Sequence, residues 1–345
     1  MKWGGGSRKV LILGYSPDLS GGVTKVTNAL VDAIPELELH PILYCYHPKI
    51  ISVAHTARSF LSLFLKLILF RSNYRMVQVV VGSSGDSVRS LPFLYLSKLF
   101  RLKTALQFHS NCDNIYAGLP ALLAGLVSSV WRKVDVNFFL SESLAKQHFS
   151  QIGKVKSYAI IPNPVFDDWV TLKVVPLSER TKDLVFLGRW SKEKGVFDLV
   201  RAMAELPSHT ECEFYSNSPY GLEYLNCKFN NWVSEKEVIQ IVAQSKVLVL
   251  PSYAEAYPLV LLEAAATGTP FIASNVGGVA DIVKESKAGL LVEPGDITGL
   301  RRTILQLLSD EELWLLLSSA GRTWVKRLKV SDVCNMWLRE YSRLD

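Results

Sequence analysis

The sequence predicts an α/β protein with two Rossmann-like domains, each a doubly wound parallel sheet, facing a central cleft. Two observations predict this class. Short aliphatic and β-branched runs alternate with segments of helical periodicity in both halves of the chain, which is typical of parallel sheets covered by helices. A proline-rich stretch, from Pro162 to Pro176, separates the halves and has the composition of a linker. With 345 residues, 49% of them hydrophobic, the chain is long enough to bury two such cores.

The first domain is expected over residues 1–165. Its first strand runs from Val10 to Leu13, and a glycine-containing turn at 20–23 leads into a helix over 24–32. Ligands of open α/β sheets bind beyond the carboxyl ends of the strands, so the loops after these strands should face the cleft. The strands expected in this domain are 10–13, 41–44, 76–81, 104–108, 134–140 and 158–161.

The second domain is expected over 181–328, after a linker at 166–180. Its strands again alternate with helices, such as those at 196–206 and 235–243. Residues 329–345 carry apolar side chains at helical spacing, and we expect a final helix there that crosses back onto the first domain. The strands expected in the second domain are 184–187, 213–215, 247–250, 271–273 and 289–292.

Two apolar stretches raise the question of a membrane. The stretch 59–70 is well under the roughly 20 residues that a crossing helix needs. We expect a helix packed on the first sheet with a narrow polar stripe; the alternative is a helix lying in a membrane interface, helped by nearby basic residues. The stretch 114–131 contains glycine, proline and serine and is expected to be a buried domain helix. The stripe residues are Ser59, Ser62 and Lys66, and the basic residues are Arg58, Lys66, Arg71, Arg75, Lys98, Arg101 and Lys103.

Composition narrows the classes of function. The five cysteines are scattered without a Cys-x-x-Cys pair, which argues against a zinc site or a disulfide framework. No secretory signal is visible at the start of the sequence, so a cytoplasmic location is expected. Residues 1–165 hold 18 Lys+Arg and 8 Asp+Glu, whereas residues 166–345 hold 20 and 24. This asymmetry predicts an anionic partner for the first domain, such as a membrane surface; the basic residues form no known nucleic-acid module, so no nucleic acid is expected.

The stretch 251–268 carries two glutamates eight residues apart, Glu255 and Glu263. Pro258 suits the first position of a helix, which places Glu255 in the loop before it. Glu263 then falls in the second turn of an otherwise apolar helix. A carboxylate in such surroundings is costly unless it is hydrogen-bonded, so something polar is expected to meet it.

Further candidates lie at the carboxyl ends of other expected strands. Arg189 and Lys194 stand in a strand-to-helix loop where cations suit a diphosphate, although ordinary surface cations are the alternative. Gly21 and Gly22 lie in the first strand-to-helix turn and permit close approach of a ligand. That turn lacks the full Gly-x-Gly-x-x-Gly pattern, so no nicotinamide site is expected. His109 follows its strand at the carboxyl end, where a hydrogen-bonded loop histidine is the alternative to a functional one.

Taken together, these residues resemble the retaining glycosyltransferases of family 4, also called group 1, whose fold is the GT-B architecture of two Rossmann-like domains. The resemblance covers nearly the whole chain and is strongest from 184 to 296. Any one motif is weak, but the ordered set is highly specific. The motifs found in the family's order and spacing are Leu187-Gly188-Arg189 with Lys194-Gly195, Pro251-Ser252, the two glutamates, Gly268-Thr269-Pro270, Asn275-Val276-Gly277-Gly278 and 289–296.

The resemblance implies a role for each candidate. Arg189 and Lys194 would clamp the nucleotide diphosphate electrostatically, without a metal. Glu263 would accept hydrogen bonds from the ribose hydroxyls, and Glu255 would contact the hydroxyls of the donor sugar. His109 would meet that sugar near the reacting carbon. The remaining residues of the implied donor site are Gly21, Gly22, Ala256, Tyr257, Pro258 and Leu259.

The reaction implied by the resemblance transfers a hexose-type sugar from a nucleotide diphosphate sugar to a hydroxyl, with retention, by front-face displacement. A UDP-sugar is favoured over GDP-mannose, and neither cofactor nor metal is required. The expected acceptor is a lipid-linked or cell-surface saccharide, as in polysaccharide or lipopolysaccharide biosynthesis, with the enzyme peripheral on the inner face of the cytoplasmic membrane. Ala256 and Tyr257 replace the family's commoner Gly-Phe, which should place a methyl and a hydroxyl beside the sugar pocket.

Two other classes stay open at this point. A sugar-nucleotide epimerase with the same fold would act on the nucleotide sugar itself and need no acceptor. A non-catalytic subunit that binds a sugar nucleotide or a glycan would retain its ligand without turnover. The paired carboxylates also suggest a glycosidase-like couple, but the resemblance assigns them to ribose and sugar hydroxyls instead.

Overall fold

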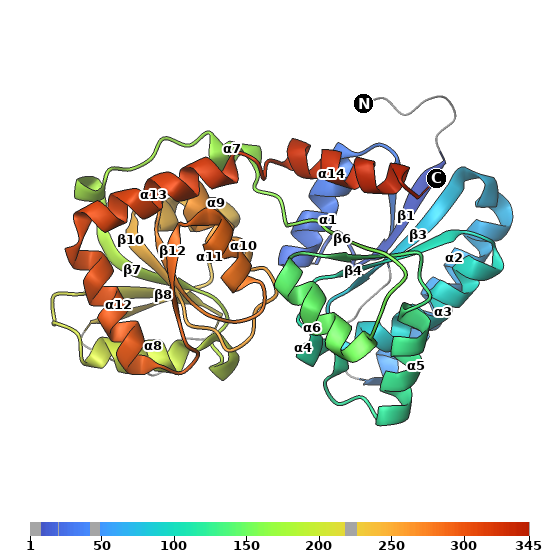
Figure 1. Ribbon diagram of the computed structural model, residues 1–345, viewed down its shortest axis with the longest axis horizontal. Coiled ribbons are helices and arrows are strands. Elements are labelled where there is room, and N and C mark those ends of the chain that lie inside the picture. Colours follow the sequence, from blue (N-terminus) through green and yellow to red (C-terminus); the bar gives the residue numbers. More distant parts are fainter. Residues whose placement is uncertain (1–7, 20, 42–48, 218–225, 345) are drawn as a thin grey trace. The chain divides into compact units, whose positions relative to one another are not determined.

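The computed structural model describes residues 8–19, 21–41, 49–217 and 226–344, with side chains described from residue 56 onward in the third range. The chain divides into two compact units. The first comprises Met1–Asn163 and Val330–Asp345, and the second comprises Pro164–Lys329. Each unit is a parallel sheet with helices on both faces (Figure 1).

The first sheet has six parallel strands in the order β2-β1-β3-β4-β5-β6. Its central strands are almost continuously apolar because helices cover both faces. The strand β1 pairs with β2 on one side and with β3 on the other, so the strand order reverses beside it, where ligands of such sheets commonly bind. The strands are β1 Lys9–Gly14, β2 Leu37–Pro41, β3 Tyr74–Val81, β4 Lys103–Phe108, β5 Val136–Phe139 and β6 Tyr158–Ile160.

The second sheet also has six parallel strands, in the order β12-β11-β10-β7-β8-β9. Here the order reverses between β7 and β10, which pair directly. The loops that follow these two strands carry the candidate residues of this unit. The strands are β7 Lys182–Leu187, β8 Cys212–Ser216, β9 Cys227–Asn231, β10 Ser245–Leu250, β11 Phe271–Ser274 and β12 Gly289–Val292.

Sequence patterns located the central strands and the edge strands β6 and β12, but not the other two edge strands, β2 and β9. The strand predicted at 41–44 overlaps β2 only at Pro41, and 42–44 lie outside the described residues. The strand β9 was not predicted. Both lie at the end of a sheet, where one side of the strand has no neighbour and polar residues are tolerated, so neither forms an apolar run.

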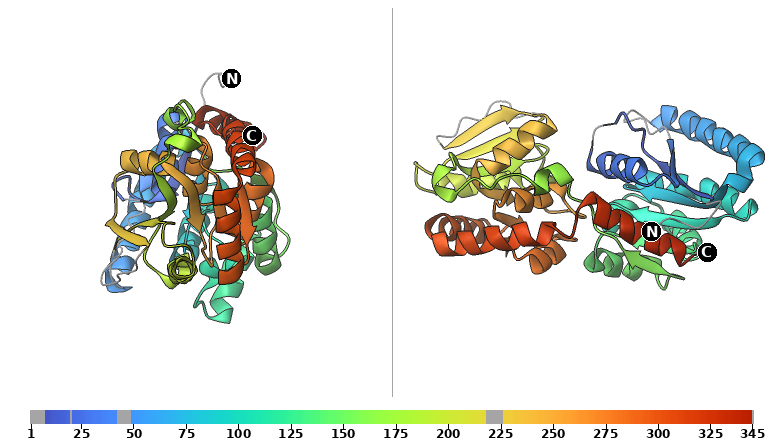
Figure 2. Two further views of the ribbon diagram at one scale, coloured as in Figure 1. Left: turned by 90° about the vertical axis from the view of Figure 1, so that its left-hand side faces the viewer. Right: turned by 90° about the horizontal axis from the view of Figure 1, so that it is seen from above.

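The helices of the first unit cover both faces of its sheet (Figure 2). One face of β1 and β3 packs against α2, α3, α5 and α6. On the opposite face, the Tyr341 hydroxyl of the last helix donates to Gln78 Oε1 at 2.8 Å, and Trp337 packs edge-on against Phe138. The helices are α1 Gly22–Ala33, α2 Lys49–Phe70, α3 Ser84–Leu99, α4 Cys112–Tyr116, α5 Ala121–Trp131, α6 Glu142–Ile152 and α14 Val330–Ser342.

Two expectations about the surface of this unit are wrong. The helix packs on the first sheet through Leu63 and Leu67, as expected, but of the predicted polar stripe only Ser62 is exposed: Ser59 is buried, and Lys66 forms an ion pair with Glu38 at 2.5 Å. The outward side of α2 carries leucines instead. The helix α5, expected to be buried, has Leu122 at 89% exposure. No helix in the described ranges is both long and apolar enough to cross a bilayer.

The second unit also includes the segment 166–180, which was predicted as a linker. Arg322 of α13 donates to the Leu172 carbonyl at 3.1 Å. Arg180 is buried and donates to the carbonyls of Ser245 and Gly268, which ties the end of the segment to the sheet. The helices of this unit are α7 Asp167–Val170, α8 Val196–Ala204, α9 Glu235–Ala243, α10 Leu259–Thr267, α11 Val279–Ser286, α12 Ile297–Ser309 and α13 Glu311–Val325.

Candidate functional site

The candidate site of the second unit centres on an ion pair between two loops. Lys194, at the end of the loop after β7, donates to Glu255 Oε1 at 2.6 Å. The Ser252 hydroxyl donates to the same oxygen at 2.8 Å. The lysine and glutamate side chains are 18% and 9% exposed, so the pair is largely shielded from water. Glu255 Oε2 makes no hydrogen bond with the described residues and is left to accept from a ligand.

Two glycines bring the surrounding loops close enough to form this pair. A Cβ on Gly195 would lie 1.9 Å from the Pro251 carbonyl oxygen, so only glycine lets the loops after β7 and β10 touch. A Cβ on Gly277 would lie 1.7 Å from the Glu255 carbonyl oxygen. Both glycines have positive φ, at 66° and 52°, which glycine adopts at no steric cost. The loop that bears Glu255 is therefore held from both sides.

Arg189 and Lys194 lie in one loop but differ in their surroundings. Trp190 turns inward and packs against Phe197 and Phe229. Arg189 beside it points outward, with 61% of its side chain exposed, and meets Glu193 at 3.7 Å. A surface ion pair of this kind contributes little and leaves the guanidinium able to move to a ligand. The structure thus brings Lys194, but not Arg189, into contact with Glu255.

The helix α10 begins beside this pair with no side-chain cap. Pro258 occupies the N-cap position and makes no capping hydrogen bond. The first N–H groups of a helix have no acceptor within it, and the helix dipole adds partial positive charge there. Glu263 lies one turn further along and is 8% exposed, as a carboxylate among apolar neighbours. An uncapped helix start next to a lysine is suited to an anion such as a phosphate.

The two residues before Pro258, Ala256 and Tyr257, contribute differently to the structure of this loop. The Ala256 carbonyl accepts from Gly278 N at 2.8 Å, which fixes the loop to the start of α11. The Tyr257 side chain is buried, and burial together with the nearby carboxylates of Glu285 and Asp281 raises its pKa. Its hydroxyl is therefore packed beside α11. The hydroxyl expected beside the sugar pocket is not available there, and only the backbone of Tyr257 is left as a candidate.

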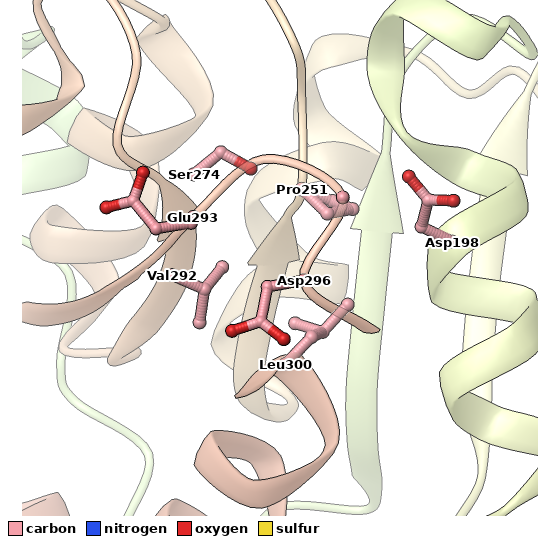
Figure 3. A pocket seen from close by; sticks show the side chains of 8 residues that line it. Asp198, Pro251, Ser274, Val292, Glu293, Asp296 and Leu300 are labelled. Carbon is pink, nitrogen blue, oxygen red and sulfur yellow. The ribbon is translucent and has the colours of Figure 1, made fainter. Parts of the chain in front are cut away.

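A small pocket lies at the carboxyl ends of β10, β11 and β12 (Figure 3). Two of its carboxylates already have structural partners: Asp198 accepts from the Tyr253 hydroxyl at 2.6 Å, and Asp296 caps α12 by accepting from Gly299 N at 2.8 Å. A pocket lined by carboxylates repels a diphosphate. The pocket borders the candidate site, but it is not the position where we expect the diphosphate to bind. The lining residues are Asp198, Pro251, Ser274, Val292, Glu293, Gly295, Asp296 and Leu300.

The first unit holds its own candidate residues near the carboxyl ends of β1, β3 and β4. Gly21 is the N-cap of α1 with φ at 148°, and no heavy atom lies within 4 Å of a Cβ placed on it. The helix that begins at Gly22 has no side-chain cap. The turn is thus open to a ligand. The Tyr15 hydroxyl donates to Asp86 Oδ2 at 2.6 Å, which ties the residue after β1 to the first turn of α3.

His109 directly follows β4, and its N–H bonds the Val81 carbonyl at 2.9 Å. Its Nε2 is buried and has no partner among the described residues. Burial lowers the pKa of His109 to about 4, so the imidazole is neutral at pH 7. A neutral imidazole donates a hydrogen bond through one ring nitrogen and accepts one through the other, but it has no positive charge with which to stabilise a substrate.

A second buried histidine was missed at the sequence level. His148 of α6 packs against the stacked rings of Phe108 and Phe139, and its Nε2 contacts the Ser110 carbonyl at 3.1 Å. Burial lowers its pKa to about 4 as well. It supports the loop after His109 from beneath. Neither its position in the helix nor its spacing from other polar residues signals this role in the sequence.

Comparison with solved structures gives the class of fold. The chain superposes on sucrose-phosphate synthase from Thermosynechococcus elongatus with a TM-score of 0.79 at 19% identity, covering 98% of this chain and 99% of that one. It superposes on Anabaena HepE in complex with UDP-glucose with a TM-score of 0.76 at 15% identity, covering 98% and 100%. The two six-stranded parallel sheets are therefore the GT-B glycosyltransferase fold, as the sequence predicted.

Comparison of sequences matches part of the chain to one family. Residues 181–310 match the family model of the glycosyl transferases group 1. N-acetyl-alpha-D-glucosaminyl L-malate synthase of Bacillus anthracis is 32% identical over 239 residues, 64% of this chain and 62% of that protein. Glycogen synthase of Mycobacterium tuberculosis is 30% identical over 141 residues, 37% of this chain and 34% of that protein. The chain is thus similar to the glycosyl transferases group 1 over most of its second unit. It spans less than two thirds of the length of these two relatives.

Proposed function

We propose that the protein is a retaining glycosyltransferase that moves a hexose-type sugar from a nucleotide diphosphate sugar to a saccharide hydroxyl. The observation that carries this proposal is the Lys194–Glu255 pair beside the uncapped start of α10. It places a cation, backbone N–H donors and a carboxylate within one small region. A sugar diphosphate needs all three, because its phosphates are anionic and its sugar hydroxyls donate hydrogen bonds.

In this proposal the donor diphosphate competes with Glu255 for Lys194. The phosphate oxygens would take up the ammonium and the first N–H groups of α10. The exposed Arg189 side chain would swing in from its weak contact with Glu193. Glu255, partly released, would accept from sugar hydroxyls through Oε2. Glu263, buried in α10, would accept from the ribose.

The leaving group is stabilised by these positive charges alone, and no metal enters the proposal. The bond from the anomeric carbon to the diphosphate oxygen breaks while a bond to the acceptor oxygen forms on the same face. The acceptor proton passes to the departing phosphate oxygen, so atoms and charge balance. His109, neutral at pH 7, would hydrogen-bond the sugar without donating a proton to it. Gly21 and Gly22 would let the first unit approach the diphosphate.

The nucleotide base and the acceptor are proposed from two further observations. HepE, solved with UDP and with UDP-glucose, shares the fold, which favours a UDP-sugar over GDP-mannose. The excess of basic residues in 1–165 favours a lipid-linked or cell-surface saccharide as the acceptor, handled at the inner face of the cytoplasmic membrane. Polysaccharide or lipopolysaccharide biosynthesis would be the corresponding process.

A thermal-shift panel of UDP, UDP-sugars and GDP-mannose tests the donor site. A ligand that binds only the folded protein raises its melting temperature in proportion to the logarithm of its concentration. We expect a UDP-sugar to give the largest shift, and Glu263→Ala to lose most of it. The matched control is Glu312→Ala, which removes an exposed carboxylate from α13. If Glu263→Ala keeps the full shift, the ribose assignment is wrong.

Turnover separates the transferase from the two alternatives. An epimerase would convert the best donor without any acceptor, and a binding subunit would show the thermal shift but no conversion. A transferase would release UDP faster when an acceptor saccharide is added. The configuration at the new linkage, read by proton NMR of the product, tests retention, and an inverted product would refute the front-face mechanism.

A further inference from the structure

Three neighbouring helices of the first unit present an apolar surface to solvent. The helix α2 packs beside α3 through the ring contacts Phe60–Phe93 and Phe64–Phe100. The helix α3 packs beside α5 through the bond from Trp131 Nε1 to Ser90 Oγ, at 3.1 Å. All three cover the same face of the sheet (Figure 1). We call their outward side the α2–α3–α5 face.

The outward side of α2 is apolar over its last three turns apart from the exposed Ser62. Leu61, Leu65, Ile68 and Leu69 follow one another at helical spacing, and each is at least 50% exposed, as is Phe70. An ordinary surface helix of a soluble protein shows charged residues on its outer side and apolar ones toward the core. Here Leu63 and Leu67 fill the core, so the helix is apolar on both sides.

The two neighbouring helices continue this surface. On α3, Tyr95 and Leu99 are exposed, the latter to 75%. On α5, Leu122 and Leu126 are exposed, and no charged residue occurs before the helix ends at Trp131. Half of the exposed large apolar side chains in the described ranges lie on these three helices, while the others are scattered along the chain. Such gathering marks an interaction surface.

Basic residues accompany this face. Residues 56–133 contain ten Lys+Arg and two acidic residues, of which Asp86 is buried. Lys98 at the end of α3 donates to the Lys133 carbonyl just after α5, at 2.8 Å. Arg71 after α2 donates to the Arg101 carbonyl at 3.0 Å. The carboxyl ends of the three helices therefore meet, and their basic residues gather at one end of the apolar surface. The exposed members are Lys98, Arg101, Lys103, Arg132 and Lys133.

We propose that the α2–α3–α5 face docks on the surface of a bilayer that contains anionic lipids. The leucines would enter the boundary between headgroups and acyl chains, and the basic residues would contact the headgroup anions. A second copy of the chain fits this face less well, because residues 56–133 hold ten Lys+Arg and only two acidic residues, so two such faces offer each other little charge to complement their basic clusters. The inference rests on the membrane part of the proposed function and names the face that serves it. It does not depend on the donor site.

Vesicle flotation of the full chain tests the proposal. The probes are vesicles of phosphatidylcholine alone and of phosphatidylcholine mixed with phosphatidylglycerol, at low and high salt. We expect binding to the mixed vesicles that falls as salt rises. The triple substitution Leu61→Ser, Leu65→Ser, Leu69→Ser should weaken the partition coefficient at least about tenfold, because it removes inserted apolar area without changing charge.

The matched control makes the same change at exposed leucines of the second unit: Leu305→Ser, Leu315→Ser, Leu316→Ser. It should leave vesicle binding unchanged. If the α2 variant folds poorly, Leu122→Ser with Leu126→Ser tests the same face from α5. Equal binding of the two triple variants, equal binding to both lipid mixtures, or no binding by the unaltered protein would each overturn the proposal.

Two further measurements separate the explanations. Light scattering after size exclusion tests self-association, and a dimer abolished by the α2 substitutions would assign the face to a second copy and overturn membrane docking. The thermal shift with UDP reports on the donor site alone. If the unaltered protein shows the UDP shift but binds no vesicles, the docking face is refuted and the transferase proposal stands. If it binds the mixed vesicles but shows no UDP shift, the docking face stands and the donor-site proposal is refuted.

Discussion

Replacing Gly277 by alanine should displace Glu255 without removing any group that contacts the ligand in our proposal. The new Cβ would lie 1.7 Å from the Glu255 carbonyl oxygen and 3.7 Å from that of Ala256. A tolerable contact needs about twice the shorter distance, so the loop must retreat by roughly 1.5 Å. The hydrogen bond from Gly278 N to the Ala256 carbonyl, now 2.8 Å, would stretch or break.

The cost to stability has two parts. Alanine at the Gly277 φ of 52° costs about 1–2 kcal/mol, because Cβ crowds the following carbonyl. Loss of the loop hydrogen bond adds about 0.5–1.5 kcal/mol. The total, about 1.5–3.5 kcal/mol, lowers the melting temperature of a unit of this size by on the order of 10 °C. The effect on donor use should be larger, since misplacing a site residue by about 1 Å costs roughly a hundredfold in rate.

The assay is thermal unfolding with and without a UDP-sugar, together with the rate of UDP release in the presence of an acceptor. The control is Gly85→Ala on α3, where the nearest atom to the new Cβ is a flexible arginine tip at 3.5 Å and φ is not positive. It should change the melting temperature little. If Gly277→Ala behaves like Gly85→Ala in both measurements, the close contact with Gly277 does not hold Glu255 in place, and this prediction is refuted.

Two further predictions concern buried groups. Because burial lowers the pKa of His148 to about 4 from an unfolded value near 6.5, the folded state binds its proton less readily, and stability falls as pH drops from 6.5 to 4. His148→Phe should remove about 3 kcal/mol of this pH dependence, measured by urea unfolding with hydrogen exchange of peptides 104–152; an unchanged dependence would contradict it. Arg180→Lys should lower the melting temperature by several degrees, because Arg180 bonds the Ser245 and Gly268 carbonyls. The exposed Arg343→Lys should not, and equal effects of the two would refute the assignment.

The sequence predicted strand positions most accurately where a strand is buried on both faces and is therefore apolar. The central strands β3 and β10 are such runs, and their positions were found to within two residues. The edge strands β2 and β9 carry alternating or polar residues, and pattern reasoning misplaced one and missed the other. The outward face of α2 also differs from the expectation. An apolar residue predicts burial within its own domain, but the leucines on this face are exposed, which is typical of a surface that meets a partner.

For the candidate site, spacing identified residues but not the contacts between them. Glu255 and Lys194 were both selected, but their direct ion pair depends on Gly195 and Gly277 allowing two loops to touch. No local pattern encodes that distance. The residues next to Tyr257 in the sequence predict an exposed loop for its hydroxyl. The side chain is instead buried beside α11, which comes about 20 residues later in the chain.

The two glutamates of the loop and helix differ in what fixes them, and this difference bears on catalysis. Glu263 is fixed by the rigid backbone of α10 and by burial, which suits a group that must recognise the same ribose in every donor. Glu255 is fixed by Lys194, Ser252 and the Gly277 contact, and the first of these is a charge that the diphosphate itself would remove. Donor binding would therefore free Glu255 at the moment when the sugar needs an acceptor for its hydroxyls. A site built in this way couples recognition of the phosphate to recognition of the sugar.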